Sequence, residues 1–167
     1  MTSFDVGYLD KFEIRTYYNI LPEEERLVLR YKGGLNLKRI SGAPGLQTYS
    51  NLHLLSEESD YLINKIREKV EIENEVLRSW INYTDHRFSY QYWHNHNKPD
   101  YYEFTCVYMI DNPENVGTWF KYNDKIYKSR CPTNSAITFS KRLDHTVPTD
   151  VTKPRYSLAI DFHRHLS

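Results

Sequence analysis

The chain has 167 residues, 40% of them hydrophobic, a length that suits one domain with a real core better than two. We therefore expect a single domain over residues 1–167. Its 22 basic and 22 acidic residues give a formal net charge of zero, so no overall charge draws the chain to nucleic acid or to an anionic membrane. These features argue against both kinds of partner.

The sequence contains no long apolar run, and its N-terminus lacks a basic-then-apolar signal. An intracellular, cytoplasmic location is therefore expected. The two cysteines, Cys106 and Cys131, have neither the spacing of a zinc site nor that of a disulfide framework. We interpret Cys106 as a small core residue rather than a nucleophile.

The first half of the chain, residues 1–80, is expected to combine short strands with one supporting helix. Residues 21–26 resemble a helix start or a turn, and residues 27–31 predict a strand closed by glycines. Apolar residues at spacings of three and four predict an amphipathic helix from about Ser56 to Trp80. Within it, residues 71–73 leave room for a break.

From residue 83 onward, short strands and tight turns predominate. Asn123-Asp124 is a hairpin signal. The strands are expected at residues 101–110, 117–122, 125–128, 136–139 and 155–162. Because no strand–helix–strand alternation occurs, this pattern favours a β-sandwich or barrel, with residues 83–163 as its core.

The segment Trp93-His94-Asn95-His96 precedes the strand expected at residues 101–110. Residues two apart in an extended segment share a face, so His94 and His96 can point at one metal ion. A further ligand has to come from elsewhere, and His145 is the best candidate. The alternative is a pair of surface histidines, the commoner outcome for an isolated His-x-His motif.

On the last expected strand, alternation places Arg155, Ser157, Ala159 and Asp161 on one face. A barrel interior is a costly place for an unpaired guanidinium, whereas bidentate pairing with a carboxylate satisfies it. A dicarboxylate ligand would therefore account for Arg155.

These segments, taken in order, resemble a known family. Residues 45–53, 79–83, 93–96 and 155–162 are similar to a small branch of bacterial and phage non-haem iron, 2-oxoglutarate-dependent oxygenases, and the resemblance covers about residues 45–162. It implies a mainly β fold with flanking helices, the double-stranded β-helix or cupin-like jelly roll. It also implies Fe(II) and 2-oxoglutarate as cofactors, and a dioxygenase that hydroxylates its substrate with release of succinate and CO2.

Carried onto this sequence, the resemblance assigns two metal ligands to His94 and His145. The family usually has an aspartate or glutamate where this chain has His96, so a site of three histidines would depart from the two-histidine, one-carboxylate pattern. Asp100 is the alternative carboxylate ligand if His96 turns outward. We favour His96 on strand geometry.

The resemblance assigns the 2-oxoglutarate arginine to Arg155, with Ser157 gripping the same carboxylate. Tyr108 has two interpretations of about equal weight, a contact with the co-substrate from a neighbouring strand or a place in the core. No catalytic residue is predicted beyond the metal ligands.

Two other functions remain open at this point. The spacing His94-x-His96-x3-Asp100 followed by His145 also resembles a cupin metalloenzyme that uses no 2-oxoglutarate. A jelly-roll binding module without catalytic activity is the second. The expected substrate is a small molecule or a peptidyl group, and the sequence indicates no oligomeric state.

Overall fold

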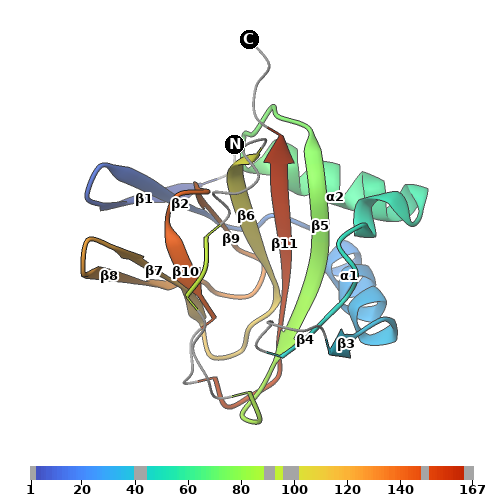
Figure 1. Ribbon diagram of the computed structural model, residues 1–167. Helices are drawn as coiled ribbons and strands as arrows, with labels where there is room; N and C mark the ends of the chain where they lie inside the picture. The colour runs from blue at the N-terminus through green and yellow to red at the C-terminus, as the bar shows by residue number, and fades with distance from the viewer. Residues whose placement is uncertain (1–2, 40–44, 89–92, 96–101, 148–150, 164–167) are drawn as a thin grey trace.

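The computed structural model describes residues 3–39, 45–88, 93–95, 102–147 and 151–163 (Figure 1). Two antiparallel sheets face each other, and two helices cover the outer face of the larger one. The elements are β1 (Phe4–Leu9), β2 (Phe12–Tyr17), α1 (Glu23–Leu35), β3 (Lys38–Arg39), β4 (Leu46–Gln47), the 3-10 helix η1 (Leu52–Leu54), α2 (Glu57–Lys69), β5 (Val76–Thr84), β6 (Tyr102–Asp111), β7 (Val116–Tyr122), β8 (Lys125–Arg130), β9 (Ala136–Ser140), β10 (Asp144–Thr146) and β11 (Arg155–His163).

The larger sheet has eight strands in the order β1-β2-β9-β6-β11-β5-β4-β3, and the smaller has three in the order β10-β7-β8. Figure 1 shows β11 between β5 and β6, with the helices on one side and the small sheet on the other. This architecture confirms the predicted mainly β fold with flanking helices. Neither α1 nor α2, the α-helices of the described residues, is long and apolar enough to cross a bilayer.

Alternation along the central strands builds an apolar core on each face of the large sheet. On β6, Cys106 and Tyr108 face the helices and pack with Leu62 and Ile66 of α2. The intervening residues, typified by Met109, face the small sheet and join a second core. The inner face, between the two sheets, is where the candidate site lies.

The helix predicted from Ser56 to Trp80 is shorter in the structure. It starts as expected, because Ser56 Oγ accepts the backbone N–H of Ser59 at 3.0 Å and caps α2. It ends at Lys69, and Glu71 adopts a positive φ of 59°. The prediction is wrong beyond that point because Val76–Thr84 forms β5, which pairs with β11 along its whole length.

The strand predicted at residues 27–31 is also wrong, because these residues belong to α1. Three glutamates occupy the first turn of α1 and Lys32 its last, which suits the helix dipole. Leu29 is buried, and Gly33 packs so closely on β5 that an added Cβ would lie 3.0 Å from Ile81 Cγ2. Helix-to-sheet packing, which a local apolar run cannot reveal, explains the difference.

The strands predicted in the second half are confirmed as β6 to β9 and β11. Asn123 and Asp124 connect β7 to β8 with φ of 48° and 63°, the positive values that a tight two-residue hairpin requires. Cys106 and Cys131 are both buried free thiols. Burial raises the pKa of Cys106, in keeping with its predicted place in the core.

Candidate metal and co-substrate site

The structure brings His94 and His145 together from distant parts of the sequence. His145 lies on β10 opposite Phe120 of β7, and His94 forms an isolated antiparallel bridge with it. The two residues exchange backbone hydrogen bonds of 3.1 and 2.7 Å. Their imidazole centroids are 4.1 Å apart, so two of the predicted metal ligands are neighbours.

The orientation of His145 is set by its surroundings. Its side chain is 6% exposed, its ring lies 4.8 Å from that of Phe139, and its Nδ1 is 3.1 Å from the carbonyl oxygen of Leu143. Because a carbonyl oxygen can only accept, this contact places the hydrogen of a neutral ring on Nδ1 and the lone pair on Nε2. Metal-binding histidines are commonly held in this way.

The predicted third ligand, His96, and its alternative, Asp100, lie outside the described residues. Beside them, the side-chain amide of Asn95 donates to Asp144 Oδ1 at 2.8 Å and ties this segment to β10. Within the described part of the chain, no three His, Cys, Asp or Glu side chains cluster as a metal site. The structure therefore describes two of the three predicted ligands.

Arg155 begins β11 with its side chain on the inner face, and the residue is 2% exposed. Its Nε donates to the Val116 carbonyl oxygen at 3.4 Å, and its Nη2 contacts Met109 Sδ at 3.5 Å. Among the described residues, no carboxylate forms an ion pair with it. Burial lowers the pKa of Arg155 to about 10, so it remains a cation at neutral pH.

Ser157 follows two residues later on the same inner face and is also buried. It lies opposite Asn82 of β5 and Met109 of β6. The predicted juxtaposition of a guanidinium and a hydroxyl on one face of the last strand is confirmed.

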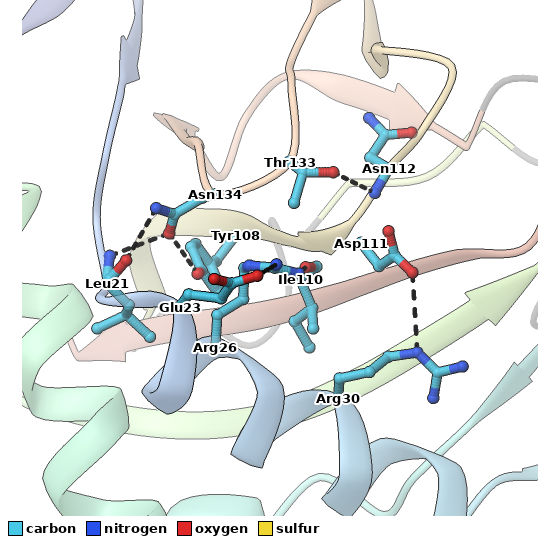
Figure 2. A network of polar contacts seen from close by, with 10 residues as sticks. All are labelled: Leu21, Glu23, Arg26, Arg30, Tyr108, Ile110, Asp111, Asn112, Thr133 and Asn134. Carbon is cyan, nitrogen blue, oxygen red and sulfur yellow. Dashed lines mark hydrogen bonds and ion pairs between the residues drawn. The ribbon is translucent and has the colours of Figure 1, made fainter.

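Tyr108 lies on the other face of the sheet. It pairs with Leu158 in the register of β6 and β11, and both side chains belong to the core under the helices. Its hydroxyl donates to Asn134 Oδ1 at 2.6 Å, and the Asn134 amide in turn donates to the Leu21 carbonyl (Figure 2). The structure therefore corrects the first interpretation of Tyr108, since it does not reach the face that carries Arg155.

Sequence reasoning missed the functional candidates on β5. Arg78, Trp80 and Asn82 are half-buried on its inner face, whereas Ser79 and Ile81 between them are buried toward the helices. Trp80 Nε1 donates to Asn82 Oδ1 at 3.2 Å. The available signal was the alternation of Ile81 and Tyr83 with Asn82 and Thr84, but the helical interpretation of this stretch outweighed it.

We compared the chain with family models, curated proteins and solved structures. No family model matches the sequence, and no curated protein matches it. An oxidoreductase of the 2OG-Fe(II) oxygenase family from Burkholderia pseudomallei has a similar structure, with a TM-score of 0.68 and 14% identity over 91% of this chain and 84% of its own.

Two prolyl hydroxylases are also similar. A prolyl-4-hydroxylase from Pseudomonas putida has a TM-score of 0.63 and 14% identity over 92% of this chain and 93% of its own. The viral collagen prolyl hydroxylase of Paramecium bursaria Chlorella virus-1, solved with 2-oxoglutarate, has a TM-score of 0.61 and 13% identity over 91% and 96%. The chain therefore has the double-stranded β-helix fold of these 2-oxoglutarate/iron(II) oxygenases.

Proposed function

We propose that the protein is a non-haem Fe(II), 2-oxoglutarate-dependent oxygenase that hydroxylates its substrate and releases succinate and CO2. The observation that carries this proposal is the buried guanidinium of Arg155, for which the described residues provide no carboxylate. Removing a charge from water without a partner costs several kcal/mol. A dicarboxylic acid that binds here would supply the missing partner.

In this proposal, Arg155 and Ser157 hold the carboxylate of 2-oxoglutarate that lies away from the metal. The guanidinium offers a planar fork of N–H donors, and the Ser157 hydroxyl adds one O–H donor on the same face. Because both residues are almost fully buried, water competes little for these hydrogen bonds, which strengthens them. The match in charge and donors favours a dicarboxylate over a neutral ligand.

His94 and His145 would provide two of the metal ligands, and His96 or Asp100 would complete the set. The contact of His145 Nδ1 with the Leu143 carbonyl orients Nε2 for this role. Bound iron would supply the activation of dioxygen, for which protein side chains have no equivalent chemistry. The protein's own contribution is to position the reactants and to exclude water.

A calorimetric titration of the anaerobic Fe(II) protein tests the proposal. We expect 2-oxoglutarate to bind. 2-Oxopentanoate, which lacks the second carboxylate, should bind about a hundredfold more weakly, a difference of about 3 kcal/mol in binding free energy. Arg155→Met should remove this difference without unfolding the protein, since methionine fills similar volume and leaves no buried charge.

Arg15→Met is the matched control, because Arg15 lies on β2 and pairs with Glu13 at 2.7 Å. It should bind 2-oxoglutarate like the wild type. Failure of the metal-loaded wild type to bind 2-oxoglutarate would overturn the proposal. That result would favour a cupin-type enzyme or an inactive binding module.

A further inference from the structure

A second arginine on the inner face is held by a buried acid. Asp161 is 0% exposed, and its Oδ2 accepts Arg78 Nη2 at 2.8 Å and Nε at 3.3 Å. Its Oδ1 accepts the Thr105 hydroxyl at 2.8 Å. Both carboxylate oxygens are therefore engaged inside the protein, so Asp161 itself does not meet a ligand.

The guanidinium is the accessible member of this pair. The Arg78 side chain is 40% exposed, and its Cζ lies 5.5 Å from the centroid of the Trp80 ring. Asp161 fixes one edge of the guanidinium and Trp80 lies beside it, which restricts the rotamers of a side chain that is otherwise flexible. A half-exposed cation held in one place is suited to recognition of an anion.

The pair lies on the histidine side of the candidate site. Thr105, which binds Asp161, pairs with Phe139 across β6 and β9, and the Phe139 ring contacts His145. Arg155 lies six positions before Asp161 on β11, roughly 20 Å along the strand. A five-carbon acid held by Arg155 cannot extend over that length, so Arg78 and Arg155 serve different groups.

We infer that Arg78 is a specificity-determining residue that binds a carboxylate of the substrate, with Asp161 and Thr105 as positioning residues. This inference rests on the proposed function, since it takes the inner face beside the histidines as the substrate side. A forked carboxylate matches the guanidinium, whereas a neutral amide of the same shape offers one acceptor oxygen fewer. The charge of Asp161 offsets that of Arg78, so the orientation of the N–H donors provides the selectivity.

The test uses two small probes of equal shape, N-acetylglycine and N-acetylglycinamide. The full chain, loaded with Zn(II) as a diamagnetic substitute and saturated with 2-oxoglutarate, is titrated while the ¹⁵N signals of Arg78 Nε and Trp80 Nε1 are recorded. We expect the acid to shift both signals with an affinity about tenfold higher than that of the amide. Equal affinities for the two probes would overturn the inference.

Two variants separate recognition from stability. R78Q alone would leave Asp161 buried without its cation, so the double variant R78Q/D161N removes both charges together. We expect it to lose the preference for the acid, read at Trp80 Nε1, and to keep its affinity for 2-oxoglutarate. R78K keeps the charge without the fork and should retain only part of the preference. An unchanged preference in the double variant would show that the pair is only structural.

The outcomes distinguish this inference from the proposed function. Binding of 2-oxoglutarate with no preference at Arg78 would leave the proposed function standing and remove the inference. A preference for the acid at Arg78 in a protein that does not bind 2-oxoglutarate would remove the proposed function and leave Arg78 as a carboxylate-binding residue. The two outcomes can be told apart because the two signals report on Arg78 and Trp80 rather than on Arg155.

Discussion

His94 and His145 show how single residues on separate segments come together as two candidate metal ligands. Their backbone bridge brings the two residues side by side, and their imidazole centroids lie 4.1 Å apart. We expect His94→Ala and His145→Ala each to weaken Fe(II) binding at least about tenfold, since loss of a ligand should cost no less than loss of the groups that support one. Metal content after dialysis, with Fe(II) titration, checks this.

His86→Ala is the control for those variants. His86 is exposed in the turn after β5, and its replacement should leave metal content unchanged. Full metal occupancy in both His94→Ala and His145→Ala would remove these residues from the site.

His53 connects a single residue to the pH dependence of stability. Its Nδ1 is 2.7 Å from Ser79 Oγ, which also accepts the His53 backbone N–H at 2.9 Å, so the serine hydroxyl can donate to a neutral ring. Burial lowers the pKa of His53 from its ordinary 6.5. As pH falls, the His53 ring of the unfolded chain therefore takes up a proton before that of the folded chain. The stability that the neutral, buried ring contributes is lost as the pH falls below 6.5.

We therefore expect the urea midpoint, measured with chelator present, to fall between about pH 7 and about pH 5. His53→Asn should show a smaller fall, because asparagine keeps an acceptor near Ser79 and does not titrate. An equal fall in both proteins would assign the pH dependence to other groups.

Single residues also mark the limit of what the sequence could predict. Alternation within one strand was sufficient to place Arg155 and Ser157 on a common face. Tyr108 required the register between β6 and β11, where a shift of one residue moves a side chain to the opposite face. That register includes a bulge between Tyr156 and Ser157, which no local sequence pattern predicts.

At the scale of elements, the β7–β8 hairpin supports β10, the strand that carries His145, because β7 also pairs with β10. Gly117 allows β7 and β8 to approach closely: a Cβ there would collide with the Ser129 side chain and lie 2.7 Å from its carbonyl oxygen. We expect Gly117→Ala to lower the free energy of unfolding by about 2 kcal/mol. Chemical denaturation measures this.

Gly34 is the matched control within α1. A Cβ there meets only Arg30 Nη1 at 3.5 Å, so Gly34→Ala should raise stability by up to about 1 kcal/mol, because alanine favours the helix. Equal effects of the two substitutions would contradict this account of hairpin packing.

The stretch Val76–Thr84 shows why an element can be misassigned from sequence. Its apolar residues fit a helical spacing that continues from α2, whereas alternation with polar residues is seen only at Ile81 and Tyr83. Pairing with β11 on one side and β4 on the other stabilises this stretch as a strand, and these partners are distant in sequence. The functional candidates Arg78 and Trp80 were missed for the same reason.

For the whole molecule, the sequence indicated a β-rich domain, and the family resemblance indicated the jelly roll. Neither indicated that strands of the first half, β1 to β5, join the same sheet as the later strands. In the structure, β2 pairs with β9, and β5 pairs with β11, so earlier strands flank the later strands β9, β6 and β11 on both sides of one sheet. Such long-range pairings depend on packing over both faces, which local patterns do not encode.

The most direct test of the whole account is an anaerobic titration of the Fe(II)-loaded protein with 2-oxoglutarate, followed by visible absorption. We expect the weak charge-transfer band of a 2-oxoglutarate chelate in the wild type, together with a much weaker response in Arg155→Met and none in His145→Ala. A protein that binds Fe(II) but produces no band at saturating 2-oxoglutarate would contradict it.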